Sequence, residues 1–120
     1  MIIAVDFDGV LCEKKFPAIG APNRKLIAHL VNLRINGAKI ILWTCRNGSL
    51  LDDAVLWCNK QGLSFDAVNE NLQENIEQYG GDTRKIFAHV YIDDQNAPDE
   101  FMTKYDIPYV QGQTYFREIL

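Results

Sequence analysis

Residues 2–10 read IIAVDFDGV, a short apolar run followed by an acidic motif. Its first four residues form an unbroken apolar run, which is typical of a strand buried on both faces of a parallel sheet. Asp6 and Asp8 follow the run directly, and Gly9 would let the chain turn sharply just behind them. Because ligands of an open parallel sheet bind beyond the carboxyl ends of its strands, the stretch predicts a central strand that ends in an acidic site.

Strand-like and helix-like segments alternate along the rest of the chain. Further short apolar runs predict strands at residues 40–43, 65–68, 87–92 and 108–110. Helical periodicity predicts helices at residues 24–36, 49–60, 71–79 and 98–104. Alternation at this spacing implies βαβ units with right-handed crossovers. We therefore expect one α/β domain over residues 1–120, a three-layer Rossmann-like fold with a mainly parallel sheet.

Local signals refine this prediction in the first half of the chain. Asn23 is predicted to cap the first helix and Gly37 to end it. Ser49 and Asp52 have the spacing of a capping box, which predicts that the second helix starts there. Residues 13–23 are expected to be a long irregular loop. A loop of this length inside a compact domain is usually functional or mobile, and this one directly follows the acidic motif.

Composition limits the classes of function. The chain has 120 residues, with 12 basic and 16 acidic side chains and a net charge of −4, so its charge does not indicate nucleic-acid binding. No apolar run approaches the ~20 residues that cross a bilayer, and no signal peptide is recognised, so no membrane association is expected. The three cysteines have no CxxC spacing, which predicts a reduced, cytoplasmic compartment.

Polar residues also follow two other predicted strands. Thr44 and Arg46 come after the run at 40–43, and Asp93 and Asp94 come after the run at 87–92. In a parallel sheet these ends meet at one edge. A guanidinium beside a phosphate could bind its oxygens in a bidentate way, so Arg46 is predicted either to bind substrate or to form a surface salt bridge.

Two pairs of aspartates at one edge indicate a metal site. In an extended chain Asp6 and Asp8 project the same way, roughly 6–7 Å apart along the backbone. Carboxylates this close repel each other unless a cation joins them or one takes up a proton. Asp93 or Asp94 would add hard oxygen ligands from another direction, which suits Mg²⁺ bound together with waters and a substrate phosphate.

These motifs resemble those of the haloacid dehalogenase (HAD) superfamily of phosphohydrolases. DFDGV at residues 6–10 is similar to motif I, and ILWT at residues 41–44 is similar to motif II, a hydrophobic strand that ends in Ser or Thr. Lys85 is similar to the motif III lysine, and YIDD at residues 91–94 to the acidic motif IV. The motifs occur in the order of the family and span most of the chain. The resemblance implies a Mg²⁺-dependent phosphatase that hydrolyses a phosphate monoester.

The resemblance also implies roles for single residues. Asp6 would be the nucleophile that forms an aspartyl-phosphate, and Asp8 would be the general acid and then the general base. Thr44 would donate a hydrogen bond to the phosphoryl oxygens. Lys85, or the adjacent Arg84, would neutralise charge on the nucleophile and the phosphate. These roles agree with the chemistry of phosphoryl transfer, which depends mainly on positioning and charge stabilisation.

For the metal, the resemblance implies Asp6, the backbone carbonyl of Asp8, and the acidic pair Asp93 and Asp94. Asp94 is the preferred direct ligand, with Asp93 in the place of the glycine that the family pattern usually has. In the alternative, Asp93 binds the metal directly, and Asp94 supports the site without contacting the metal.

The cap domain that many members of this superfamily carry does not fit in this chain. A site without a cap would accept bulky substrates or be covered by a neighbouring subunit in a homo-oligomer. The identity of the phosphorylated substrate stays open, because fold alone cannot choose it. The alternative function is a non-catalytic module, which binds a phosphorylated ligand or accepts a phosphoryl group as receiver domains do. The receiver type is disfavoured because no lysine follows the last strand.

Overall fold

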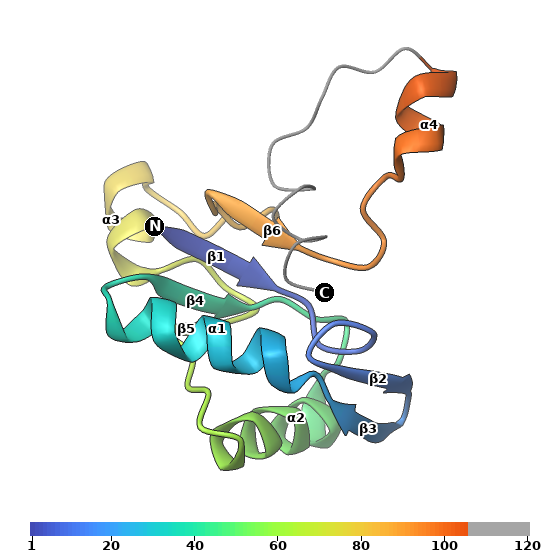
Figure 1. Cartoon of the computed structure of the whole chain (residues 1–120). Helices are drawn as coiled ribbons and strands as arrows, with labels where there is room; N and C mark the ends of the chain where they lie inside the picture. The colour runs from blue at the N-terminus through green and yellow to red at the C-terminus, as the bar shows by residue number, and fades with distance from the viewer. Residues whose placement is uncertain (106–120) are drawn as a thin grey trace.

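A parallel sheet of four strands forms the centre of the protein in the computed structural model, which describes residues 1–105 (Figure 1). The strands are β1 (Ile2–Val5), β4 (Lys39–Leu42), β5 (Ala67–Val68) and β6 (Val90–Ile92). Their order is β5–β4–β1–β6, and Ile3 of β1 lies opposite Ile40 and Val90 of its two neighbours. The predicted α/β class and parallel sheet are confirmed. The strand predicted at 108–110 lies outside the described residues.

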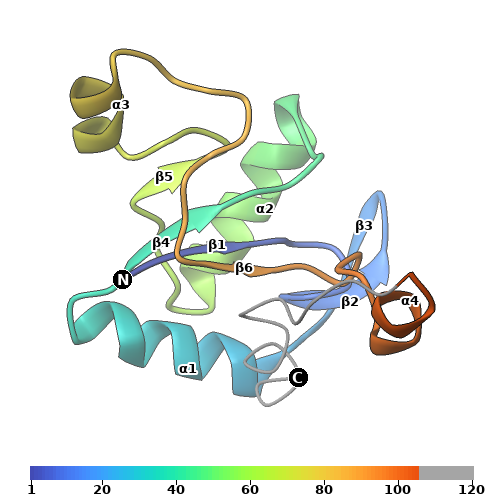
Figure 2. The same cartoon turned by 90° about the horizontal axis from the view of Figure 1, so that it is seen from above.

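Helices lie on both faces of the sheet, and the last one lies beyond the carboxyl end of β6 (Figure 1, Figure 2). They are α1 (Arg24–Ile35), α2 (Gly48–Lys60), α3 (Gln73–Tyr79) and α4 (Asp99–Lys104). Leu30 of α1 and Ala54 of α2 belong to the same buried cluster as Ile40 of the sheet. Ile41 points to the opposite face, where it packs with Leu72 next to α3. Successive residues of β4 thus enter two different cores, which explains its continuous apolar sequence. Among residues 1–105, no helix is long and apolar enough to cross a bilayer.

The two ends of α1 lie where the sequence predicts them. Oδ1 of Asn23 accepts a hydrogen bond from the backbone N–H of Leu26 (3.3 Å), which caps the helix. After Ile35 the chain turns through Gly37, whose φ of 103° lies in the left-handed region that favours glycine. Nδ2 of Asn23 also donates to the carbonyl of Val10 (3.1 Å), which ties the start of the helix to the segment behind the acidic motif.

The start of α2 differs from the predicted capping box. The helix begins at Gly48, with Asn47 at the N-cap and no side-chain capping bond. Asn47 has extended backbone, with φ −140° and ψ 173°, which is the conformation that an N-cap residue adopts. Ser49 therefore lies inside the first turn, and the capping box predicted from the spacing of Ser49 and Asp52 is wrong.

The segment at 13–23, predicted to be an irregular loop, forms a β-hairpin with Cys12. β2 (Cys12–Lys15) and β3 (Ala18–Pro22) pair in antiparallel fashion, with Lys14 opposite Ile19. Most residues of the hairpin are exposed, so the sequence lacks the alternating apolar pattern that marks a half-buried strand. The hairpin follows the acidic motif and lies beyond the carboxyl end of β1 (Figure 2).

β6 is shorter than the run predicted at 87–92. The backbone N–H of Phe87 donates to Oδ1 of Asn71 (2.7 Å), and that of Ala88 donates to the hydroxyl of Tyr91 (3.2 Å). Because side chains take these two donors, the first residues of the run stay outside the sheet although their composition suits a strand.

A bidentate ion pair lies at the amino end of the sheet, away from the acidic motif. Arg34 in the last turn of α1 donates from Nε and Nη2 to the two carboxylate oxygens of Asp66 (3.2 and 3.1 Å). Oδ2 of Asp66 also accepts the backbone N–H of Ile40 (2.8 Å). Burial acts to raise the pKa of Asp66, but these hydrogen bonds outweigh it and hold that pKa below its ordinary value.

Asp66→Asn is expected to lower the free energy of unfolding by about 1–2 kcal/mol at neutral pH, because the charge-assisted bonds from Arg34 are lost. A carboxyl whose pKa falls on folding stabilises the protein above its unfolded pKa, here 3.8, and this contribution is lost as the pH falls through the lower folded value. Urea unfolding of both proteins at neutral pH and at about pH 3 measures the effect, and the difference between them should narrow in acid. A difference of equal size at both pH values would show that the ion pair is not its cause.

Candidate active site

The carboxyl ends of three strands meet at one edge of the sheet. The backbone N–H of Asp6, directly after β1, donates to the carbonyl of Ile92 at the end of β6 (2.9 Å). The N–H of Trp43, directly after β4, donates to the carbonyl of Val5 (2.9 Å). These bonds continue the pairing past the strand ends, so the segments that follow β1, β4 and β6 leave the sheet side by side.

Three carboxylates converge at this edge. Asp6, Asp93 and Asp94 each offer one oxygen, and these oxygens lie within 4.8 Å of one another. Oδ1 of Asp6 accepts the backbone N–H of Phe7 (2.8 Å), and Oδ1 of Asp93 accepts that of Gln95 (2.9 Å), so the chain that follows holds both side chains. The structure thus brings both predicted acidic residues after β6 to the predicted nucleophile. We call these three residues the acidic cluster.

Gly9 makes room for the acidic cluster. Its φ of 81° lies in the left-handed region, which lets the chain turn behind the acidic motif. A Cβ built at this position would overlap the carboxylate of Asp94. A side chain at position 9 would therefore displace the Asp94 carboxylate from its place in the acidic cluster.

The surroundings of Asp6 change its acidity. Burial is the largest cause, and it raises the pKa of Asp6 from 3.8 to about 7. The charges of Asp93, Asp94 and Asp8 act in the same direction, and the N–H of Phe7 acts against them. A carboxyl whose pKa is shifted this far by burial and by neighbouring charges, at the end of a strand, is a candidate functional group.

The acidic cluster has the donor chemistry of a site for a hard divalent cation. Mg²⁺ is typically bound by one or two carboxylates, several waters and a substrate phosphate. The cluster supplies three carboxylate oxygens from two chain segments within 4.8 Å of one another. A cation among them would offset the repulsion that helps to raise the pKa of Asp6. The residues present therefore fit Mg²⁺.

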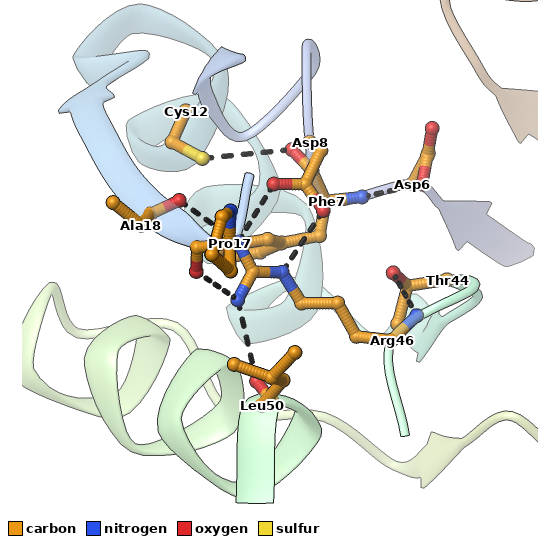
Figure 3. A network of polar contacts seen from close by, with 9 residues as sticks. All are labelled: Asp6, Phe7, Asp8, Cys12, Pro17, Ala18, Thr44, Arg46 and Leu50. Carbon is orange, nitrogen blue, oxygen red and sulfur yellow. Dashed lines mark hydrogen bonds and ion pairs between the residues drawn. The ribbon is translucent and has the colours of Figure 1, made fainter. Parts of the chain in front are cut away.

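Asp8 does not share the acidic cluster. Its carboxylate turns to Arg46, which donates from Nε to Oδ2 (2.9 Å) and from Nη2 to Oδ1 (2.8 Å). Figure 3 shows the side chains of Asp6 and Asp8 pointing in different directions. The prediction that they project the same way assumed an extended chain, but β1 ends at Val5 and the chain then turns through Gly9. The Asp8 carboxylate is therefore one half of an ion pair and not a member of the group around a metal.

Arg46 is buried, and its guanidinium is fully engaged. The residue is 2% exposed. Besides its bonds to Asp8, it donates from Nη2 to the carbonyl of Ala18 (3.0 Å) and from Nη1 to the carbonyls of Pro17 (3.2 Å) and Leu50 (3.5 Å). Every N–H group of the guanidinium thus has an acceptor within the protein. The predicted surface salt bridge is corrected to a buried ion pair, and the predicted role in substrate binding stays a prediction.

Thr44 lies just beyond β4, where the side chain of Asn69 holds its backbone. Oγ1 of Thr44 accepts the backbone N–H of Arg46 (3.1 Å), which leaves the hydroxyl proton free to be donated elsewhere. Asn69 follows β5, accepts the N–H of Thr44 (2.8 Å) and donates to the carbonyl of Arg46 (3.4 Å). Its φ of 54° is left-handed, a conformation in which asparagine is enriched. In the sequence, the feature that indicates this role is the position of Asn69 directly after the strand predicted at residues 65–68.

The structure does not bring Lys85 to the acidic cluster. Its ammonium lies 5.8 Å from the ring centroid of Tyr91, and neither it nor the alternative Arg84 forms an ion pair with the cluster within residues 1–105. Four residues later, the N–H of His89 donates to the carbonyl of Ile2 (2.8 Å), at the amino end of β1. The chain therefore returns to the opposite edge of the sheet before β6 begins, and order along the sequence did not reveal this.

The chain is similar to a conserved protein from Bacteroides thetaiotaomicron whose structure has been solved. The two sequences are 35% identical, and the match covers 91% of this chain and 93% of the other with a TM-score of 0.72. No family model and no curated protein matches the chain.

Proposed function

The chain belongs to the same family as the conserved Bacteroides thetaiotaomicron protein, and we propose that it is a Mg²⁺-dependent phosphatase of the HAD type. The observation that carries the proposal is the convergence of Asp6, Asp93 and Asp94 at the carboxyl end of a parallel sheet. The raised pKa of Asp6 supports it, because burial and neighbouring charge are what distinguish this carboxyl from an ordinary turn former. The proposed substrate is a phosphate monoester.

In the proposed reaction Asp6 is the nucleophile. A bond forms between its carboxylate oxygen and phosphorus while the bond from phosphorus to the leaving oxygen breaks. Asp8 gives a proton to that leaving oxygen and becomes a carboxylate. Water then attacks the phosphorus of the aspartyl-phosphate and passes a proton to Asp8, and inorganic phosphate leaves as its bond to Asp6 breaks. Thr44 would donate its hydroxyl proton in a hydrogen bond to a phosphoryl oxygen.

Asp6, Asp93 and Asp94 would hold Mg²⁺, with Asp94 as the preferred direct ligand. When bound, the cation supplies charge neutralisation at the transferring phosphoryl group. With Lys85 away from the cluster, the remaining stabilisation from described side chains comes from the hydroxyl of Thr44.

A second candidate function is a non-catalytic module that binds a phosphorylated ligand or accepts a phosphoryl group on Asp6. Two observations favour it. Lys85 lies away from the acidic cluster, and both oxygens of Asp8 are already bonded to Arg46. Such a module would bind the cation but would release no phosphate from an ester in repeated cycles.

The proposal is a phosphatase of the cap-less type, and the arrangement of residues 1–105 supports it. A hairpin and α1 lie between β1 and β4, and α2, β5 and α3 lie between β4 and β6. Substrate specificity would therefore come from the hairpin and the strand ends, on an open site that takes bulky phosphorylated substrates or is covered by a neighbouring subunit.

Removal of Mg²⁺ is expected to abolish turnover, because the proposed ligands are hard oxygens whose charge needs a cation. The measurement is phosphate release from an aryl phosphate with Mg²⁺, in excess chelator, and after Mg²⁺ is returned. Asp94→Asn should raise the Mg²⁺ concentration for half-maximal rate by about 10²-fold, and Asp93→Asn should raise it less.

Glu74→Gln is the matched control, because Glu74 is an exposed carboxylate in the first turn of α3, outside the acidic cluster. It should leave the Mg²⁺ dependence unchanged. Full turnover in excess chelator would refute the proposed function. The reverse order of the two aspartate variants would make Asp93 the direct ligand.

A further inference from the structure

Arg46 carries a buried charge, and the proposed reaction assigns it no role. We propose that it is a positioning residue, which fixes the orientation of the Asp8 carboxyl and couples this orientation to the β2–β3 hairpin. The inference rests on the proposed function, in which Asp8 transfers the proton to the leaving oxygen.

The bidentate pair restricts Asp8 without using all of its acceptor sites. Nε and Nη2 of Arg46 donate to the two oxygens of Asp8 (2.9 and 2.8 Å), and this planar fork sets the tilt of the carboxyl group as well as its distance. Each oxygen has a lone pair beyond the one that Arg46 uses, so the Asp8 carboxyl keeps sites for a further hydrogen bond. The side chain of Arg46 is 1% exposed and that of Asp8 is 16% exposed, so Asp8 is the more accessible partner.

Two aromatic rings hold the guanidinium. Its central carbon lies 4.9 Å from the ring centroid of Phe7 and 5.1 Å from that of Phe16. Phe7 is fully buried, whereas Phe16 lies between β2 and β3 and is 57% exposed. The guanidinium therefore contacts one ring that the core fixes and one that belongs to the hairpin.

Arg46 joins the tip of the hairpin to the body of the protein. Arg46 donates to the carbonyls of Ala18 (3.0 Å) and Pro17 (3.2 Å), which Figure 3 shows on the same guanidinium that binds Asp8. A cavity of about 380 Å³ lies between this part of the hairpin and α2 and reaches Arg46. Cys12 and Ile19 of the hairpin pack against the core, whereas residues 13–18 are exposed, so at the tip the contacts with Arg46 are the ones that join the hairpin to the site. If the hairpin moved away, Arg46 would lose its bonds to the carbonyls of Pro17 and Ala18. The guanidinium would then hold Asp8 in a less fixed orientation.

Arg46→Lys tests the positioning role, because lysine keeps the charge but cannot form the fork. A misplaced Asp8 should lower kcat/KM for an alkyl phosphate, whose leaving oxygen needs a proton, by about 10²-fold. It should change kcat/KM for an activated aryl phosphate by no more than a few-fold, because that leaving group departs without a proton. In an Asp8→Asn background the substitution should have no further effect on the ratio of the two kcat/KM values.

Arg34→Lys is the matched control, because Arg34 makes the same two-point bond with Asp66 at the opposite edge of the sheet. It should not change the ratio of the two kcat/KM values. Amide hydrogen exchange of residues 13–20 measures the coupling to the hairpin. Exchange there should become faster in Arg46→Lys and stay unchanged in Arg34→Lys.

Phe16→Ala is a second variant in case Arg46→Lys does not fold, since the exposed ring can be removed without opening the core. It should shift the ratio of the kcat/KM values for the two esters in the same direction as Arg46→Lys does, but by a smaller factor. Equal losses on both esters would overturn the positioning role and leave the phosphatase in place. Unchanged exchange in the hairpin would overturn the coupling. A wild-type protein without Mg²⁺-dependent turnover would overturn the proposed function, and this role with it.

Discussion

Asp6→Asn is expected to abolish the turnover of phosphate esters, with kcat lower by about 10⁶-fold. The substitution keeps the shape of the side chain but replaces the attacking carboxylate with an amide, which is a poor nucleophile. In the proposed reaction no other group attacks phosphorus. Phosphate release measures the loss, and mass spectrometry should find a phosphate adduct on Asp6 of the wild-type protein during turnover and none on the variant.

Asp52→Asn makes the same chemical change on an exposed residue of α2 and should leave the rate unaltered. Substantial activity in Asp6→Asn, or an adduct that maps to another residue, would show that Asp6 is not the nucleophile.

Asp8→Asn is expected to lower kcat/KM for an alkyl phosphate by about 10²–10⁴-fold, the usual contribution of general acid–base catalysis. The loss should be much smaller for an activated aryl phosphate, whose leaving group needs little protonation. On the aryl ester the variant should accumulate the aspartyl-phosphate, because the attacking water still lacks its base. Rates on both esters, with mass spectrometry of the protein during turnover, measure these effects.

The comparison of the two esters also separates two explanations for any loss in Asp8→Asn. Asp8 pairs with a buried arginine, so its replacement could also act by disturbing the fold. A general disturbance would lower both rates alike and leave no adduct. Equal losses on the two esters would therefore remove Asp8 from the proton-transfer step.

The sheet and its acidic edge could be predicted because buried strands leave a strong local signal. β1 and β4 have cores on both faces, so their sequences are continuously apolar and easy to place. Once the strands are parallel, the residues after each run must lie at one edge. This reasoning is sufficient for Asp6, Asp93 and Asp94, whose positions depend on strand direction and not on side-chain rotamers.

The partner of Asp8 could not be predicted in this way. Arg46 lies 38 residues away, and the direction of the Asp8 side chain depends on the turn at Gly9 and on a hairpin whose strands are mostly exposed. An exposed strand pairs through its backbone and carries no apolar alternation to recognise. The position of Lys85 could not be predicted for another reason. The order of motifs along a chain does not determine at which edge of the sheet a connecting segment lies.

Folding brings Asp6, Asp93 and Asp94 together from positions that are far apart in the unfolded chain. Burial of Asp6, and then the repulsion from its neighbours, makes the folded state hold a proton on Asp6 more tightly than the unfolded state does, so stability is lost as the pH rises from 3.8 through about 7. A cation that binds only the folded state offsets this loss by mass action. The acidic cluster would thus lower the stability of the protein near neutral pH. The folded fraction would rise with the concentration of free divalent cation.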